Sequence, residues 1–395
     1  MGVGHQGKWQ DERITGGAAA QIRMDTQFNR SVGPAEKTEV AIENGFDFKS
    51  DEYRSLYAAA NVTGFQSPLW LDRLYGVLVP ALTAEPLILT VRSNGNLEAV
   101  IPLVVQKVTG ITVLQAADLG VSDYNAPVCT EETLAELAAS KDMRAALAAK
   151  IRFADVLFMR KVTGNIEAID RLLGGTARSA SENNAYVIDL MPGEFDSWRR
   201  ENLKKGFRKN IDRRRRRLTE EHDQVKWQTF VEPEDVIRAI EFIREERGAK
   251  FKDDILANDA YFEFYKACAV AGAAGGETVT SGVVVDGQLA AADFGVMGKD
   301  CLHSILCAAD VDNFGQYAPG IQSLHDLIWE RSDQGDTRFD AGIGNSRYKS
   351  DFSAREIGLE NISLALSAKG QAVSAIYHRA KPLKNFLRNI VKTVH

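Results

Sequence analysis

The sequence has few cysteines, no long apolar run and no excess of positive charge. Its four cysteines in 395 residues are irregularly spaced, which excludes a disulfide scaffold and fits a reducing compartment. The most apolar window, residues 74–91, is interrupted by Pro80, Glu85 and Pro86, so no segment reaches the roughly 18 apolar residues of a spanning helix. The first ten residues are polar and lack the apolar core of a signal peptide. We therefore expect a cytoplasmic protein.

Charge and composition exclude further classes of protein. Lysine and arginine total 48 against 54 acids, a formal net charge of −6, which argues against a nucleic-acid binder as a whole but leaves a local basic patch open. The length predicts two domains, and the composition excludes collagen-like and coiled-coil proteins. Residues 1–44 lack periodicity, so we expect a disordered leader, with ordered sequence beginning near Phe46.

The next 145 residues show a mixed α/β pattern. Asn94-Gly95 separates two strand-like runs, residues 86–91 and 97–105, and predicts a tight β-hairpin, because Asn and Gly readily take positive φ angles. A third strand is predicted at residues 111–115. The other predicted elements are helices over 51–60, 68–79 and 135–150 and short buried strands over 156–159 and 186–190.

The second half repeats this order. Asp286-Gly287 separates strand-like runs over 278–285 and 288–297, and a third strand follows over 301–308. Two helices precede this meander, one over 233–247 and one that Asn258 can cap. We interpret the shared order as a tandem duplication.

A loop with Gly315, Pro319 and Gly320 leads from the strand near Ala308 into an amphipathic helix that ends at Gly335. A strand follows over 338–341. The N-terminus of such a helix presents unpaired N–H groups at the positive end of the helix dipole, which suits a pyrophosphate, and Gly320 allows close approach. The pattern alone is weak, because most strand–loop–helix turns bind nothing.

Three sets of residues carry a family resemblance. The first set is Gln316-Tyr317-Ala318-Pro319-Gly320, then Gly335 and Phe339-Asp340-x-Gly342-x-Gly344-x-x-x-Tyr348-Lys349 with Phe352. It resembles the CelD-like (cellulose-biosynthesis-associated) acyltransferases of the GNAT superfamily, which share their fold with the Fem transferases. The second set lies in the first half and resembles the same family: Phe65-Gln66-Ser67-Pro68-x-Trp70, Ile101-Pro102-Leu103 and Ser122-Asp123-Tyr124-Asn125. The third is the basic segment 202–218, which also resembles that family. The resemblance spans roughly residues 46–365. Of the usual GNAT phosphate-loop pattern, Arg/Gln-x-x-Gly-x-Gly/Ala, only Gln316 and Gly320 are present, four residues apart.

The resemblance implies an α/β fold of two GNAT copies, with mixed, mostly antiparallel sheets flanked by helices. It places a degenerate copy in residues 45–190, an acyltransferase domain in 191–365 and a basic amphipathic tail in 366–395. The acyl-CoA co-substrate would bind the second copy, with its thioester in a splay between strand 288–297 or 301–308 and the strand near Phe339. The residues implied for the donor are Gln316, Tyr317, Pro319, Gly320 and Ile321. The first copy would shape the acceptor cleft, with Asp123, Tyr124 and Asn125.

Acyl transfer to an amine benefits from a general base, and transfer to a sugar hydroxyl requires one. Candidate bases are Asp340, Asp293 and His303, and Tyr348 or Tyr317 can protonate the leaving thiolate. Lys349 and Arg347 are candidate ligands for an anionic group of a substrate.

Each candidate also has a structural interpretation. Asp340 can cap the turn that ends at Gly342, and Asp293 can be a buried structural acid whose apolar surroundings raise its pKa. His303 lies between Cys301 and Cys307, but a fourth ligand is missing, so we expect core packing and no metal site.

Two basic segments suggest partners. Residues 204–217 hold nine cations and one acid and form an amphipathic helix, whose basic face is either simply solvated or binds an anionic acceptor, CoA phosphates or tRNA. Residues 361–395 contain no acid and six cations, with helical spacing of apolar residues broken at Pro382. This tail either covers the domain's own core or lies on an anionic membrane surface, and we favour the membrane.

The sequence therefore predicts an acyltransferase, most simply an acetyltransferase, that uses acyl-CoA to modify an amino sugar or hydroxyl in exopolysaccharide or surface-glycan assembly. The glycan part follows from the resemblance alone. Two alternatives are Fem-like transfer from aminoacyl-tRNA, which the arginine-rich helix would support, and a non-catalytic tandem-GNAT scaffold for a polysaccharide synthase.

Overall fold

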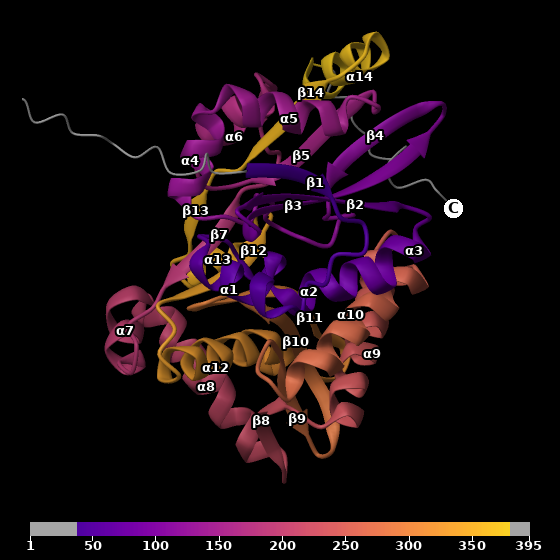
Figure 1. The fold of residues 1–395 in the computed structure, drawn as a ribbon. Coiled ribbons are helices and arrows are strands. Elements are labelled where there is room, and N and C mark those ends of the chain that lie inside the picture. Colours follow the sequence, from indigo (N-terminus) through magenta and orange to yellow (C-terminus); the bar gives the residue numbers. More distant parts are fainter. Residues whose placement is uncertain (1–37, 380–395) are drawn as a thin grey trace, which may run out of the picture. The chain divides into compact units, whose positions relative to one another are not determined.

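The computed structural model describes residues 38–379, which form two seven-stranded sheets (Figure 1). Sheet A has the strand order β1-β2-β3-β4-β5-β14-β6, and sheet B has the order β8-β9-β10-β11-β12-β7-β13. The strands of sheet A are β1 (Thr38–Ile42), β2 (Glu85–Ser93), β3 (Asn96–Val108), β4 (Ile111–Ala116), β5 (Val156–Val162), β6 (Ala177–Ala180) and β14 (Glu360–Ala365). Those of sheet B are β7 (Ala185–Asp189), β8 (Val225–Phe230), β9 (Thr278–Val285), β10 (Gln288–Met297), β11 (Cys301–Ala309), β12 (Arg338–Ile343) and β13 (Arg355–Ile357).

The two sheets repeat one plan, which confirms the predicted mixed α/β architecture of two similar halves. Each begins with a four-stranded antiparallel meander, β1–β4 or β8–β11. The meander then pairs in parallel with one further strand, β5 or β12. Both predicted hairpin turns have the required positive φ angles, at Asn94 and Gly95 and at Asp286 and Gly287.

The halves exchange one strand each. β7 follows β6 of sheet A along the chain but pairs with β12 and β13 of sheet B, and β14 follows β13 of sheet B but pairs with β5 and β6 of sheet A. The predicted strand at residues 186–190 is therefore present, but it does not belong to the sheet of the N-terminal half. A five-residue buried strand has no local signal that identifies its sheet, so a boundary at residue 190 does not separate the two sheets.

Helices cover both faces of each sheet (Figure 1). On sheet A, helices α4, α5 and α6 pack on one face, and α1, α2 and α14 pack on the other. On sheet B, helices α7, α12 and α13 pack on one face, and α9 and α10 pack on the other. The helices are α1 (Asp51–Ala59), α2 (Pro68–Arg73), α3 (Val79–Ala81), α4 (Glu131–Ala139), α5 (Lys141–Ile151), α6 (Ile166–Leu173), α7 (Phe195–Asn202), α8 (Lys205–Glu221), α9 (Pro233–Lys250), α10 (Asp259–Ala273), α11 (Val311–Phe314), α12 (Pro319–Asp333), α13 (Arg347–Asp351) and α14 (Ala368–Arg379). No helix between residues 38 and 379 has the length and apolarity needed to cross a membrane.

Two expectations about the limits of elements need correction. Ordered structure begins before Phe46, at β1, because β1 pairs with β2 along five residues and buries Val40. The helix predicted over residues 135–150 is two helices, because Ser140 takes an extended backbone and its side chain accepts from the Met143 N–H to cap α5. Residues 1–37 of the predicted leader and 380–395 of the predicted tail lie outside the described residues.

The first part of the basic tail packs on the protein itself. Helix α14 lies along β14 and β5, where Val373 is buried beside Val156 and Phe158. A Cβ atom at Gly370 would overlap the Asp155 carbonyl oxygen, so the helix approaches the sheet edge closely. Of the two alternatives for this tail, coverage of the protein's own core is therefore the correct one for residues 368–379, and the expected membrane contact is unsupported there.

Candidate active site

Strands β11 and β12 separate after three parallel pairs, of which the last joins His303 to Asp340. A bulge helps to divert β11, because Gly295 of β10 lies opposite Ser304 and Phe294 lies opposite Leu306, which leaves Ile305 as an extra residue. A cavity of about 730 Å³ opens at this separation. We call it the β11/β12 cavity; it lies in the predicted splay.

Its walls come from both halves of the chain. Residues 304–309 of β11, 318–321 at the start of α12 and 341–343 of β12 line it from the C-terminal half. Gly120, Val121 and Asp123 line it from the N-terminal half, and Arg247 and Lys250 from the end of α9. The volume is in the range of small-molecule sites, which are typically ≈ 300–1,000 Å³.

The N-terminus of α12 opens into this cavity with its backbone donors uncompensated by side chains. Ala318 precedes the helix in the left-handed region (φ 51°), no side chain among the described residues caps the helix, and its first turn holds no acid. A Cβ atom at Gly320 would meet only the Ala309 Cβ, at 3.4 Å, so packing within the described residues does not require glycine at this position. The arrangement fits an anionic group held close to the backbone.

Helix α4 of sheet A offers no such N-terminus. The Thr130 side chain caps it by accepting from the Thr133 N–H, and its first turn carries Glu131 and Glu132. These negative charges oppose an anion at the positive end of the helix dipole. Of these two helices, α12 therefore provides the better anion seat.

The five residues predicted for the donor divide into two groups. Pro319, Gly320 and Ile321 line the cavity, but Gln316 and Tyr317 do not. Gln316 accepts from Arg217 Nη2 (3.0 Å), and the Tyr317 hydroxyl donates to Glu221, so both anchor the loop to α8. The motif alone could not show these contacts, because Arg217 lies 99 residues before Gln316 and Glu221 lies 96 residues before Tyr317.

Two of the predicted catalytic residues, Asp293 and Tyr348, line the cavity. Burial raises the pKa of Asp293 to about 7, although its Oδ2 accepts a hydrogen bond from Ser323 Oγ. Burial likewise raises the pKa of Tyr348, so its phenol stays protonated at neutral pH. Cys307, opposite Asp293 on β11, also lines the cavity, and its side chain is exposed.

Asp340 and His303 form a buried contact beside the cavity and do not line it. His303 Nδ1 lies 2.8 Å from Asp340 Oδ2, and the Gly342 N–H donates to Asp340 Oδ1 (2.8 Å), the predicted turn cap. The Tyr124 hydroxyl also bonds to Asp340, and its pKa is raised by burial first and by Asp340 second. Phe65 packs on the His303 ring, with centroids 5.4 Å apart. The pair thus joins the two halves of the chain.

Two of the N-terminal motifs, residues 65–70 and 122–125, form one hydrogen-bonded unit against this pair. Gln66 Nε2 donates to the Tyr124 carbonyl (2.9 Å), and Trp70 Nε1 donates to Ser122 Oγ (3.1 Å). Asp123, whose pKa is raised by burial, reaches the cavity and accepts from the Ile343 N–H (3.3 Å). Asn125 does not line the cavity; its side chain donates to Asp118 and to the Arg160 carbonyl.

Lys349 and Arg347 are poorly placed to bind an anion. Lys349 is 3% exposed, and its Nζ donates to the carbonyl oxygens of Gly342, Ile343 and Gly344, each at 2.9 Å. An ammonium group has three protons, so none remains for a substrate. Arg347 is almost fully exposed, and its Nε lies 4.0 Å from the Asp351 carboxylate. Lys349 instead holds the loop that ends β12.

Two cavity residues and one neighbour had not been predicted as site residues. Arg247 lies at the end of α9, where it pairs with Asp254 (2.7 Å), and Lys250, one turn later, donates to the Ala309 carbonyl (2.5 Å). Ser323, which does not line the cavity, is the hydrogen-bond donor to Asp293. The sequence placed Arg247 and Ser323 on predicted helices and Lys250 just beyond one, but held no signal that these helices meet β10 and β11. Among residues 38–379, no group of three or more His, Cys, Asp or Glu side chains could hold a metal ion.

Comparisons with known proteins agree with this geometry. Residues 205–350 match the acetyltransferase (GNAT) domain family. None of the curated proteins matches the sequence. The residues 205–350 that match the GNAT domain run from α8 to α13, so they include the start of α12 and much of the wall of the β11/β12 cavity.

Solved structures show likeness over most of the chain. FemX is 11% identical, with a TM-score of 0.59 over 86% of this chain and 100% of FemX. The C-terminal domain of a putative lysylphosphatidylglycerol synthetase from Agrobacterium fabrum is 10% identical, with a TM-score of 0.53 over 86% and 98%. A conserved protein of unknown function from Bacteroides thetaiotaomicron is 13% identical, with a TM-score of 0.51 over 83% and 100%. At these identities the likeness concerns the fold.

Proposed function

We propose, from the GNAT domain at residues 205–350, that this protein is an acyl-CoA-dependent acyltransferase whose donor binds in the β11/β12 cavity. One observation carries the proposal: the acid-free N-terminus of α12, with Gly320 in its first turn, opens into a cavity between two diverging strands. The Gly320 N–H suits an oxygen of the CoA pyrophosphate, because Pro319 has no N–H and the Ile321 and Gln322 N–H groups bond to the Ala318 carbonyl. The cavity suits the pantetheine arm and thioester. Arg247 and Lys250 lie on the same wall, where they pair with Asp254 (2.7 Å) and Glu246 (3.2 Å).

Asp293 is the residue we propose as general base. With a pKa of about 7 it is roughly half ionised at neutral pH, so it can accept a proton from an amine or hydroxyl as the nucleophile attacks the thioester carbonyl. The new bond forms at the carbonyl carbon, and the carbon–sulfur bond breaks. Tyr348, which stays protonated, is placed to give its proton to the departing thiolate. Transfer of the proton from Asp293 to the Tyr348 oxygen then restores both groups.

Calorimetric titration with acetyl-CoA tests the donor site. Gly320 and Gly206 are both the second residue of a helix, and a Cβ at Gly206 would meet nothing within 4 Å, so Gly206→Glu is a matched control for Gly320→Glu. We expect saturable binding by the wild type and Gly206→Glu, and at least about 100-fold weaker binding by Gly320→Glu, because a carboxylate would occupy the anion seat. A folded wild-type protein that binds no acyl-CoA would refute the proposal.

For the acceptor we propose an amino group or hydroxyl of a sugar in surface-glycan assembly. This finer assignment rests on the resemblance of residues 316–352 to CelD-like acyltransferases. The measurement is release of the CoA thiol from acetyl-CoA in the presence of glucosamine or oligosaccharide acceptors. Release that no sugar accelerates would contradict it.

Fem-like transfer from aminoacyl-tRNA is a second candidate, because α8 exposes a row of cations. Arg215 is not free to bind RNA, since it pairs with Asp326 (2.7 Å) and lies 3.7 Å from the centre of the Trp227 ring. The test therefore replaces Lys209, Arg213 and Arg216, which are exposed, with glutamine. Salt-sensitive tRNA binding that these changes abolish would favour this candidate; tRNA binding that is absent, or that survives them, would reject it.

A further inference from the structure

A second cavity, of about 940 Å³, lies where β4 and β5 separate in sheet A. These strands pair in parallel over three residues, of which the last pair is Gln115 and Phe158, as β11 and β12 do in sheet B. Ile111, Val113, Gln115 and Phe158 line this β4/β5 cavity, with Tyr377 of α14. Helix α4, whose N-terminus carries two glutamates and a capping threonine, contributes no residue to the lining of this cavity.

The two cavities adjoin. Gly120, Ile255 and Ile343 line both of them, and Gly120 belongs to the same loop as Asp123, which reaches the β11/β12 cavity. Gly120 has no side chain to obstruct the boundary. A molecule seated in the β4/β5 cavity can therefore extend toward the proposed thioester position.

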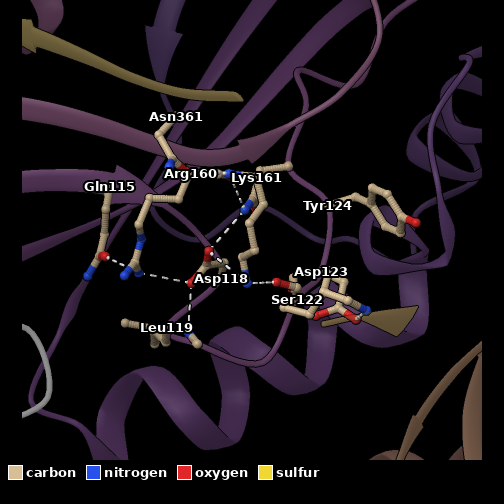
Figure 2. A network of polar contacts seen from close by, with 12 residues as sticks. Gln115, Asp118, Leu119, Ser122, Asp123, Tyr124, Arg160, Lys161 and Asn361 are labelled. Carbon is tan, nitrogen blue, oxygen red and sulfur yellow. Dashed lines mark hydrogen bonds and ion pairs between the residues drawn. The ribbon is translucent and has the colours of Figure 1, made fainter. Parts of the chain in front are cut away.

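Two cations, Arg160 and Lys161, line one end of the β4/β5 cavity. Asp118 is 1% exposed and pairs with Arg160 (3.2 Å) and Lys161 (3.6 Å), both of which point toward it in Figure 2. Asp118 also accepts from the Gly120 N–H (2.6 Å) and Asn125 Nδ2 (3.0 Å). Lys161 has further partners, because its Nζ donates to the Ser122 carbonyl and the Asp123 carboxyl group lies near it.

The acids that line the cavity either pair with other arginines or lie at its rim. Asp254 pairs with Arg247 (2.7 Å) and Asp259 pairs with Arg244 (2.6 Å). Glu182 and Asp253, with Lys252, are exposed at the rim. Arg160 and Lys161 themselves are 22% and 15% exposed, so solvent screens their charges less than those at the rim.

Arg160 is the group best suited to bind an anion there. Its Nη2 donates to Gln115 Oε1 (3.1 Å) and Asp118 Oδ1 (3.2 Å). Its Nε and Nη1 form no hydrogen bond with any residue between 38 and 379. Its Nε–H and its Nη1 group lie on different edges of the guanidinium, so each can donate a hydrogen bond to an oxygen of a carboxylate or phosphate, and Tyr261 and Tyr377 lie close to it.

We propose that the β4/β5 cavity binds the acyl acceptor through an acidic group, a carboxylate or a phosphate, held by the guanidinium of Arg160. The acceptor's amine or hydroxyl then passes Gly120 and Ile343 to reach the β11/β12 cavity. The proposal rests on the acyltransferase function above, since it supplies the second substrate of that reaction. Lys161 strengthens the site, because its backbone is fixed in the left-handed region (φ 53°) and its N–H donates to Asn361 Oδ1 (3.1 Å).

Thermal unfolding with inorganic phosphate and with acetate tests the site on the full chain. We compare the wild type with Arg160→Gln, and with Arg178→Gln as the control, because Arg178 belongs to the same sheet but pairs with Glu167 and Glu360 and does not line the cavity. We expect a saturable rise in Tm of about 2–4 °C with at least one anion in the wild type and the control. Acetyl-CoA is present at saturation throughout, so that the anion seat at α12 is occupied, and Arg160→Gln should then show no shift. A shift with phosphate alone indicates a phosphorylated acceptor, and one with acetate alone a carboxylate.

No shift in the wild type, or an equal shift in Arg160→Gln, would overturn the proposal. Asp118 keeps Lys161, Gly120 and Asn125 as partners in Arg160→Gln, so we expect the variant to fold. If it does not, Arg160→Lys carries the test: it keeps the charge but loses the Nε and Nη1 donors, and should weaken anion binding about tenfold or more. Acetyl-CoA should raise Tm in every variant; its failure to do so would count against the donor site and not against the anion site.

Discussion

Ser323 of α12 donates a hydrogen bond to Asp293 of β10, a contact of 2.5 Å between two buried side chains. The same helix begins at Pro319 in the β11/β12 cavity, one turn before Ser323. The carboxyl group that we propose as the base is therefore fixed to the helix that we propose as the seat of the CoA pyrophosphate. Donor position and base position are thus linked through α12.

Asp293→Asn should remove the base without changing the shape of the site. We expect kcat for acyl transfer to fall about 10²–10⁴-fold with little change in acetyl-CoA affinity. In the wild type, kcat/KM should rise with pH up to about pH 7, because the base must be ionised, and that limb should vanish in the variant. A variant that keeps the limb would show that another group is the base.

The same substitution should change how stability depends on pH. Asp293 has a pKa of about 7 in the folded protein and near 3.8 when unfolded, so the folded state binds the proton more tightly. Its contribution is fully present below about pH 4 and is lost as pH rises through 7, a loss on the order of 4 kcal/mol. Urea unfolding of wild type and Asp293→Asn at pH 5 and pH 8 should show the variant gaining relative stability at pH 8. Equal differences at both values would contradict the raised pKa.

Asp340→Ala should act mainly on stability. The change leaves His303 Nδ1, the Gly342 N–H and the Tyr124 hydroxyl without their shared acceptor in a buried site. We expect a loss of about 3 kcal/mol or more in the free energy of unfolding. Asp189→Ala, on the neighbouring strand β7 with its side chain largely exposed, should cost little. An Asp340→Ala protein as stable as wild type but inactive would instead indicate a direct catalytic role.

Lys349→Met should destabilise the loop after β12. Three carbonyl oxygens, those of Gly342, Ile343 and Gly344, lose their common donor, and we expect a cost of about 2–4 kcal/mol, measured by urea unfolding. Arg347→Ala, two residues earlier and almost fully exposed, should change stability by no more than about 0.5 kcal/mol. If the two variants proved equally mild, Lys349 would not be the residue that holds the loop.

Gly370→Ala tests the packing of α14. The added methyl group would overlap the Asp155 carbonyl oxygen, so α14 must shift away from sheet A. We expect a loss of about 1–3 kcal/mol and faster hydrogen exchange in β14 and α14. Gly358→Ala is the matched control, because a Cβ there meets nothing within 4 Å and its φ is not positive. Unchanged exchange in Gly370→Ala would mean that α14 does not pack as described.

Local patterns predicted much of the fold and part of the site. The turns at Asn94-Gly95 and Asp286-Gly287, the capping of α10 by Asn258, and the start of α12 at Pro319 depend on residues within about four positions of one another. The same kind of local pattern, a glycine in a loop that leads into a helix, identified Gly320 as a candidate residue for the donor. Burial of Asp293 could be predicted because it stands among apolar residues of a strand.

Long-range pairing decided the rest. The motif residues Gln316 and Tyr317 turned out to bind α8, and the basic residue Lys349 turned out to bind three carbonyl groups, because backbone acceptors compete for any side chain that folding brings near them. Arg160 had no signal in the sequence. It became a candidate only when β4 and β5 were seen to separate and leave part of its guanidinium facing a cavity.

The sequence by itself determined the order of helices and strands, the repeated meander, and the glycine at the head of α12. These depend on the side-chain period of each segment and on turn chemistry, which act over a few residues. Only the tertiary structure decided that β7 and β14 exchange sheets, that Asp340 and His303 join the halves, and that two cavities meet at Gly120. Those outcomes depend on which surfaces, distant in the sequence, bury one another. The local sequence of a short strand or of a single charged residue does not specify which residues it will contact in the folded protein.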